Sequence, residues 1–135
     1  MEVQVQPIRV LLVDDHEHIL WGLGKLIGGE KPRMMVAGIA RTFREALAAI
    51  RERRPDVVLL DIYLGKENVI DHLPELLEGS DVRVLVLTGA RDAELHQRAI
   101  ASGARGVVVK GESGEVLLRE IERVYRGSDA RGLAS

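Results

Sequence analysis

Five polar side chains come directly after short apolar runs of the sequence. Asp14 and Asp15 follow the first run, Asp61 follows the third, Thr88 closes the fourth, and Lys110 follows the fifth. The carboxyl ends of parallel strands meet at one edge of an α/β sheet, and ligands bind there. If the runs are parallel strands, these five side chains are therefore expected to lie close together.

The charges of the three carboxylates indicate a cation site. Carboxylates that converge within a few ångströms raise one another's pKa, and a divalent cation removes that penalty. An all-oxygen site with open positions suits Mg²⁺, which keeps waters and accepts phosphate oxygens. Lys110 adds a cation and Thr88 a hydroxyl donor, so the set predicts phosphoryl transfer. Asp61 is the best candidate for a nucleophile that forms an aspartyl phosphate.

Each of these residues alone has an ordinary structural explanation. An Asp-Asp pair after a strand commonly caps a helix, and an aspartate before a loop is common turn chemistry. A single threonine or lysine at the end of a strand carries almost no information. The functional interpretation rests on all five occupying equivalent places in a regular pattern.

The apolar runs themselves are unbroken, which is typical of strands buried on both faces. They span residues 10–13, 34–37, 57–60, 84–87 and 107–109. Between and after them, apolar residues recur at helical spacing. Thr42 with Glu45, Asp92 and Ser113 are expected to cap helices. Pro74 fits its helix only in or near the first turn. Strands that alternate with helices predict a doubly wound parallel α/β sheet with helices on both faces.

The composition fits one domain and excludes several classes of function. The chain has 135 residues, four aromatic residues and a net charge of −2, which argues against a dedicated nucleic-acid binder. It has no cysteine, so disulfides and cysteine-based zinc sites are excluded. No apolar stretch approaches the ~20 residues of a membrane span, and the N-terminus lacks a signal-peptide pattern. We therefore expect a cytoplasmic protein with no membrane contact.

These residues, in this order, resemble the receiver domain of two-component response regulators. The resemblance covers residues 8–126 and rests on segments 10–15, 57–61, 84–88 and 103–110. The last segment is similar to the NarL/FixJ (LuxR-type) branch, whose members usually carry a C-terminal DNA-binding domain. The resemblance implies a CheY-like, flavodoxin-like (βα)5 fold with a five-stranded sheet of order 2-1-3-4-5.

The resemblance also implies a role for each polar residue. Asp61 would accept a phosphoryl group from a phosphohistidine of a sensor histidine kinase. Asp15 and Asp61 would bind Mg²⁺ directly, Asp14 would act largely through water, and the main-chain carbonyl of Tyr63 would be a further ligand. Lys110 would bind the phosphoryl oxygens.

The expected conformational switch departs from the family pattern. In the family, Thr88 would move toward the phosphoryl group, and an aromatic ring three residues before the lysine would swing inward with it. That position is Val107 here, so Thr88 and the loop after it must carry the change without an aromatic partner. Tyr63 and Ala90 occupy positions that influence access of the hydrolytic water, and the bulk of Tyr63 is expected to slow loss of the phosphoryl group.

Three functions remain open from the sequence. The first is a receiver that changes dimerisation on phosphorylation and controls transcription through a DNA-binding domain outside this chain. In this interpretation residues 1–126 form the receiver and residues 127–135 a tail or linker. The second is a stand-alone receiver that relays phosphoryl groups or docks on another protein. The third, a Mg²⁺-dependent phosphohydrolase, is disfavoured because no general acid lies near Asp61 in the sequence, so we expect no turnover enzyme.

Two histidines at the start of the first predicted helix complete the set of candidate residues. His16 and His18 are two residues apart, a spacing at which helical side chains face different directions. We therefore expect solvent-facing side chains and no metal role for either histidine.

Overall fold

The structure is a computed structural model in which residues 6–89 and 91–127 are described. Five parallel strands form one sheet in the order β2-β1-β3-β6-β7. Their bounds are β1 Ile8–Val13, β2 Met34–Ala40, β3 Val57–Asp61, β6 Arg83–Thr88 and β7 Gly106–Val109. Counted within this sheet alone, the order is 2-1-3-4-5, so the predicted fold and strand order are confirmed.

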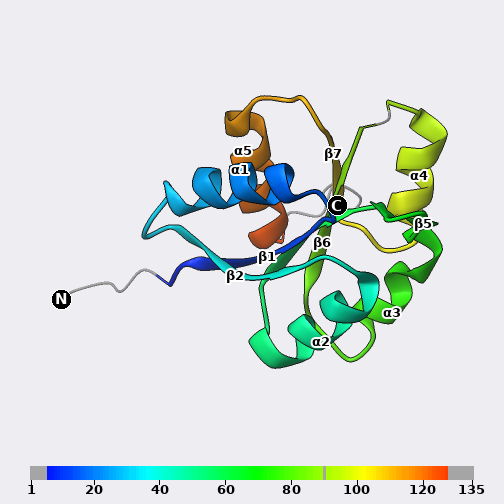
Figure 1. The fold of residues 1–135 in the computed structure, drawn as a ribbon, viewed down its shortest axis with the longest axis horizontal. Coiled ribbons are helices and arrows are strands. Elements are labelled where there is room, and N and C mark those ends of the chain that lie inside the picture. Colours follow the sequence, from blue (N-terminus) through cyan, green and yellow to red (C-terminus); the bar gives the residue numbers. More distant parts are fainter. Residues whose placement is uncertain (1–5, 90, 128–135) are drawn as a thin grey trace.

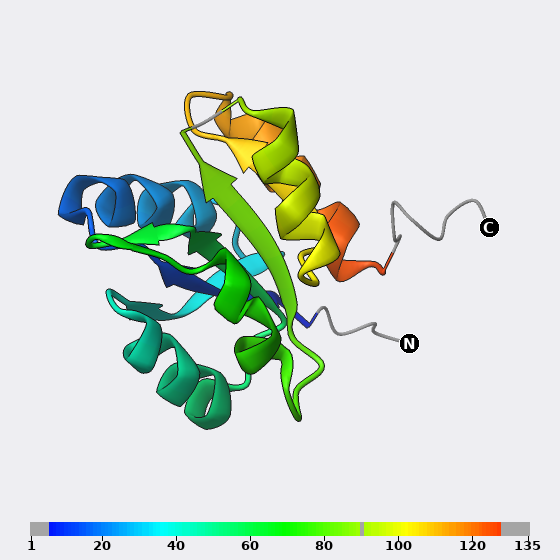
Figure 2. The ribbon, with the colours of Figure 1, turned by 90° about the vertical axis from the view of Figure 1, so that its right-hand side faces the viewer.

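Helices cover both faces of the sheet (Figures 1 and 2). Helices α1 (Glu17–Gly28) and α5 (Gly114–Tyr125) pack on one face, where Leu20 and Ile121 are among the buried core residues. Helices α2 (Phe43–Arg53), α3 (Leu73–Leu77) and α4 (Ala93–Ala101) pack on the other face. No helix in the described part of the chain is long and apolar enough to cross a membrane.

The predicted helix caps are present. Thr42 Oγ1 accepts a hydrogen bond from Glu45 N, and Asp92 and Ser113 accept equivalent bonds at the starts of α4 and α5. In a capping box, Glu45 would accept a hydrogen bond from the main-chain N–H of the N-cap residue, Thr42. Here Glu45 Oε1 accepts instead from Arg41 N, one residue earlier. These bonds fix where the helices begin and therefore fix the loops at the carboxyl edge of the sheet.

The segment between β3 and β6 contains a feature that the sequence pattern did not predict. Strands β4 (Tyr63–Leu64) and β5 (Glu67–Asn68) form a two-residue antiparallel hairpin, with Gly65 at a positive φ of 64°. A short 3-10 helix, η1 (Ile70–His72), then leads into α3. Pro74 lies in the first turn of α3, as predicted, but that helix has only five residues.

Candidate functional site

The three predicted carboxylates meet at the carboxyl edge of the sheet. Asp14 follows β1 and Asp61 ends β3, and these strands pair with Val13 opposite Leu60, so the two aspartates are neighbours. The side chains of Asp14 and Asp61 are only 1% and 4% exposed, whereas Asp15 is 31% exposed. Two buried acids and one partly exposed acid therefore form one group.

Lys110 reaches this group from the end of β7. Its Nζ atom lies 3.0 Å from Asp61 Oδ2 and 3.4 Å from Asp14 Oδ2. Lys110 N also donates a hydrogen bond of 2.6 Å to the carbonyl oxygen of Thr88, the last residue of β6. The ends of four neighbouring elements therefore position Asp14, Asp61, Thr88 and Lys110, and Thr88 is itself buried.

The electrostatics follow from burial and from the paired charges. Burial raises the pKa of Asp61, and the charge of Asp14 adds to this, while hydrogen bonds from Tyr63 N and Lys110 oppose it. Burial also acts to lower the pKa of Lys110, but its contacts with Asp61 and Asp14 outweigh burial and raise it. Lys110 is therefore held as an ammonium ion against the carboxylates.

The donor set fits a divalent cation. Carboxylate oxygens of Asp14, Asp15 and Asp61 lie within 4.8 Å of one another. Asp14 Oδ2 is buried and accepts no hydrogen bond, although Lys110 Nζ lies nearby. Hard oxygen ligands of this kind suit Mg²⁺, and an ion among them would satisfy the orphaned oxygen. Tyr63 N donates to Asp61 Oδ1 at 3.0 Å, which places the main chain of Tyr63 beside the same carboxylate.

His16 also contacts this group, although its side chain is 51% exposed and thus faces solvent as expected. Its Nδ1 atom lies 2.8 Å from Asp14 Oδ1 and 3.2 Å from Asp15 Oδ1. Its contacts with the acids were not predicted, because His16 is the N-cap of α1, with extended backbone angles of −98° and 115°, and helical spacing does not describe it. The signal that would have found it is its position directly after the acidic pair. The hydrogen bond to Asp14, with the charges of Asp14 and Asp15, raises the pKa of His16.

The β4–β5 hairpin also contacts the site. Gly65 N donates a hydrogen bond of 2.9 Å to Asp15 Oδ2, so the hairpin holds the more exposed acid in place. Tyr63, at the start of the hairpin, is 47% exposed. Val107 is half-buried and packs against the core beneath α2, α3 and α4. Ala90, which was expected to influence access of the hydrolytic water, and residues 128–135 of the expected tail lie outside the described residues.

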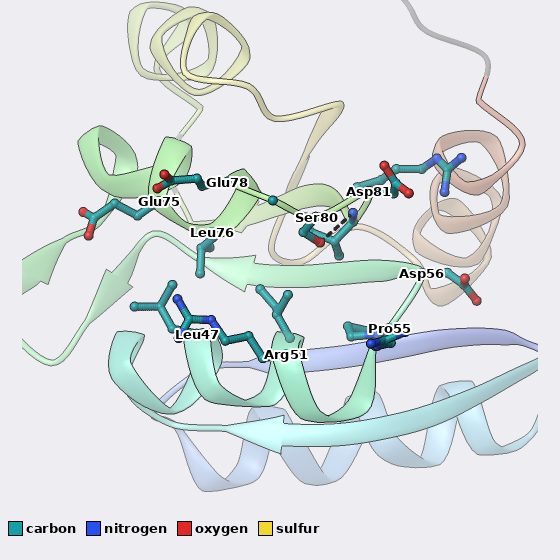
Figure 3. Close-up of a pocket in the computed structure, with 14 residues that line it drawn as sticks. Leu47, Arg51, Pro55, Asp56, Glu75, Leu76, Glu78, Ser80 and Asp81 are labelled. Atoms are coloured by element: carbon teal, nitrogen blue, oxygen red, sulfur yellow. Dashed lines mark hydrogen bonds between the residues drawn. The ribbon is translucent and has the colours of Figure 1, made fainter.

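A hollow lies at the opposite edge of the sheet and gathers none of the predicted site residues (Figure 3). Its volume is about 730 Å³, and it lies between the C-terminal ends of α2 and α3 and the loops that enter β3 and β6. Arg51, Pro55 and Asp81 line it, with further charges of both signs. No triad of metal-binding side chains is found there among the described residues. The candidate site is therefore the acidic group at the carboxyl edge.

Comparisons with known proteins place the chain in one family. A family model described as the response regulator receiver domain matches residues 10–122, a span that includes all seven predicted site residues. The chain is 40% identical over 121 residues to the DNA-binding transcriptional activator DevR/DosR of Mycobacterium tuberculosis, a match that covers 89% of this chain and 55% of the relative. The chain thus spans about half the length of that relative.

Two further matches show the range of proteins that contain such a sequence. The chain is 34% identical over 113 residues to a protein-glutamate methylesterase/protein-glutamine glutaminase of Nitrobacter winogradskyi, covering 82% of this chain and 26% of that protein. A solved two-component response regulator of the LuxR family from an Aurantimonas species is 28% identical, with a TM-score of 0.81. That match covers 95% of this chain and 96% of the solved one.

Proposed function

The chain belongs to the response regulator receiver domain family of two-component systems, and from this premise we propose that Asp61 accepts a phosphoryl group from a sensor histidine kinase. One observation carries the proposal: the buried Asp61 carboxylate lies 3.0 Å from the Lys110 ammonium and beside two further carboxylates. Phosphoryl transfer depends mainly on positioning and charge stabilisation, which this arrangement supplies.

Asp61 is the proposed nucleophile because both of its oxygens are held in place. Tyr63 N donates to Oδ1 and Lys110 Nζ donates to Oδ2. During transfer, a carboxylate oxygen bonds to phosphorus while the P–N bond of the kinase phosphohistidine breaks, and the electron pair of that bond stays on the imidazole. Lys110 is then in place to neutralise charge on the phosphoryl oxygens.

Asp14, Asp15 and Asp61, with the main-chain carbonyl of Tyr63, are the proposed ligands of Mg²⁺. When bound, the ion supplies charge neutralisation for the carboxylates and the phosphoryl oxygens. The chain itself orients the acids, since Gly65 N holds one oxygen of Asp15 and the end of β1 holds Asp14 in the buried interior.

Thr88 is the proposed reporter of phosphorylation. It is buried at the end of β6, on the strand next to β3, and its main chain is tied to Lys110. We propose that its hydroxyl turns toward the phosphoryl group and carries the following loop with it. Val107 offers no ring to fill the space that Thr88 would vacate, so the change passes through the main chain of that loop.

The proposed output is a change in dimerisation that controls transcription through a DNA-binding domain outside this chain. The relative DevR/DosR is named as a DNA-binding transcriptional activator, and the chain covers 55% of it. In this proposal residues 1–126 form the receiver, residues 127–135 begin a linker, and the protein acts in the cytoplasm without turnover catalysis. A stand-alone receiver that relays phosphoryl groups is the alternative.

The proposal is tested by incubating the protein with Mg²⁺ and acetyl phosphate and measuring its intact mass. We expect the mass of one added phosphoryl group, its loss in Asp61→Asn, and its retention in the matched control Asp71→Asn, whose acid lies on η1 with its side chain 77% exposed. An adduct that survives in Asp61→Asn would overturn the assignment. Repeated turnover of acetyl phosphate without an adduct would favour a phosphohydrolase.

A further inference from the structure

His16 adds an imidazole nitrogen to a group otherwise made of carboxylate oxygens. Its Nδ1 atom lies 2.8 Å from Asp14 Oδ1 and 3.2 Å from Asp15 Oδ1. Asp61 Oδ2 is farther from Nδ1, at 3.9 Å. One donor atom from each of these four residues lies within 4.8 Å of the other three, which places the residues around one candidate ion position.

The spacing of the donor atoms matches that of ligands around one ion. Ligand atoms about 2.1 Å from an ion lie about 3.0 Å apart at right angles and about 3.4 Å apart in a tetrahedron. The 3.2 Å distance from His16 Nδ1 to Asp15 Oδ1 lies between these values, and the 2.8 Å contact with Asp14 Oδ1 is a hydrogen bond that a bound ion would replace. The contact with Asp61 is longer, at 3.9 Å.

A second observation points to a ligand inside the group. Asp14 Oδ2 is buried and accepts no hydrogen bond, and its side chain is only 1% exposed. Its closest positive charge is Lys110 Nζ at 3.4 Å, beyond the usual length of a charge-assisted hydrogen bond. An ion placed between the carboxylates and His16 would give this oxygen a partner.

We propose that His16 is a direct ligand of a divalent transition ion at this site, alongside Asp14, Asp15 and Asp61. Imidazole suits Zn²⁺, Ni²⁺ and Cu²⁺, whereas Mg²⁺ prefers oxygen ligands and gains little from a nitrogen donor. The inference rests on the cation site of the proposed function and adds a second class of ion to it. Because both ions use the same carboxylates, a transition ion bound through His16 excludes Mg²⁺.

The chain offers a matched control for this histidine. His18 is exposed, lies in the first turn of α1, and supplies no donor atom to the group. His16→Ala removes the ring contact with Asp14 Oδ1 but keeps the main-chain bond from His16 N to the same oxygen, and the side chain makes no cap bond. His16→Ala and His18→Ala are therefore both expected to fold.

The test is isothermal titration calorimetry at pH 8 of the wild type and the two alanine variants with NiCl₂, ZnCl₂ and MgCl₂. Loss of outer-shell partners of a metal site costs 10–100-fold in affinity, so loss of a direct ligand should weaken Ni²⁺ and Zn²⁺ binding at least about tenfold in His16→Ala. Mg²⁺ affinity should change little, and His18→Ala should match the wild type. With Cu²⁺ bound, the nitrogen couplings in the electron paramagnetic resonance spectrum should be lost only in His16→Ala.

The failures of the two proposals give different results. If wild type and His16→Ala bind Ni²⁺ and Zn²⁺ equally while both bind Mg²⁺, His16 is not a ligand and the cation site of the proposed function stands. If the wild type binds none of the three ions, the cation site itself is wrong and the inference falls with it. Equal losses of Ni²⁺ affinity in His16→Ala and His18→Ala would also overturn the assignment.

Discussion

Replacing Asp15 with asparagine should stabilise the protein when divalent ions are absent and should remove most of the stabilisation that Mg²⁺ gives. Asparagine keeps the shape of the side chain and an oxygen that can accept the hydrogen bond from Gly65 N. It removes one of three negative charges that the fold places together. The variant therefore separates the electrostatic cost of the acidic group from its use as a cation site.

The expected size of the effect follows from the distances in the group. At an effective dielectric constant of 20 to 80, two unit charges 4.8 Å apart repel by about 1–3.5 kcal/mol. Loss of the attraction between Asp15 and His16, 3.2 Å apart, offsets part of that gain. We expect a net gain of about 1 kcal/mol, or roughly 4 °C in melting temperature.

Magnesium should change which of the two proteins, wild type or Asp15→Asn, is the more stable. A ligand at ten times its Kd stabilises a folded protein by about 1.4 kcal/mol. The wild type should gain that amount, whereas Asp15→Asn lacks one proposed ligand and should gain much less. Its advantage in EDTA should therefore disappear when Mg²⁺ is added.

The assay is thermal denaturation of the wild type, Asp15→Asn and the control Asp71→Asn, in EDTA and then across a series of Mg²⁺ concentrations. The control acid is exposed and lies outside the acidic group, so its response to Mg²⁺ should equal that of the wild type. The reasoning is refuted if Asp15→Asn is less stable than the wild type in EDTA. Equal gains from Mg²⁺ in all three proteins would refute the cation site.

Further predictions concern the site loop, two glycines and one surface ion pair. Tyr63→Asn should speed loss of the phosphoryl group, because the exposed ring would no longer shield it; an unchanged rate in a time course of intact mass would exclude that role. Gly103→Ala should destabilise by about 1–3 kcal/mol, because Gly103 has a φ of 118° and a Cβ would lie 2.5 Å from Leu77 Cδ1. Gly24→Ala should instead stabilise the protein by up to about 1 kcal/mol, because Gly24 lies inside α1 with open space around it. Chemical denaturation would measure the stability of both glycine variants. The hydrogen bond from Arg126, one turn later, lowers the pKa of Glu122. The ionised carboxylate therefore adds to the stability of the fold above pH 4.5, and this stabilisation is lost as the pH falls through the lowered pKa. Glu122→Gln should lower the melting temperature slightly at pH 7 and not in strong acid.

The sheet could be predicted because its strands are buried on both faces, which makes them unbroken apolar runs. The predicted end of a strand was least accurate at β2. This strand continues to Ala40, three residues past the apolar run 34–37 that predicted it. The pairing with β1 shifts register between Val10 and Leu11, which face Val36 and Gly38, so an irregularity carries the strand past Gly38. Main-chain pairing of this kind leaves no mark in the apolar pattern.

The acidic group could be predicted because strand ends fix where their next side chains lie, whatever the loops do. The contacts of His16 with the acids were not predicted, because helical spacing was applied one residue before the helix begins. The β4–β5 hairpin was missed because each of its strands has two residues, too few for any alternation to show. The hydrogen bond between Gly65 and Asp15 depends on that hairpin, so the sequence pattern could not predict it.

The central claim is that Asp61 carries the phosphoryl group, and chemical trapping tests it most directly. Borohydride reduces an acyl phosphate and converts the modified aspartate to homoserine, which peptide mass spectrometry locates. After treatment with Mg²⁺ and acetyl phosphate, we predict homoserine at position 61 and at no other acid of the group. Homoserine at Asp14 or Asp15, or none at all in protein that has gained the mass of a phosphoryl group, would contradict the account.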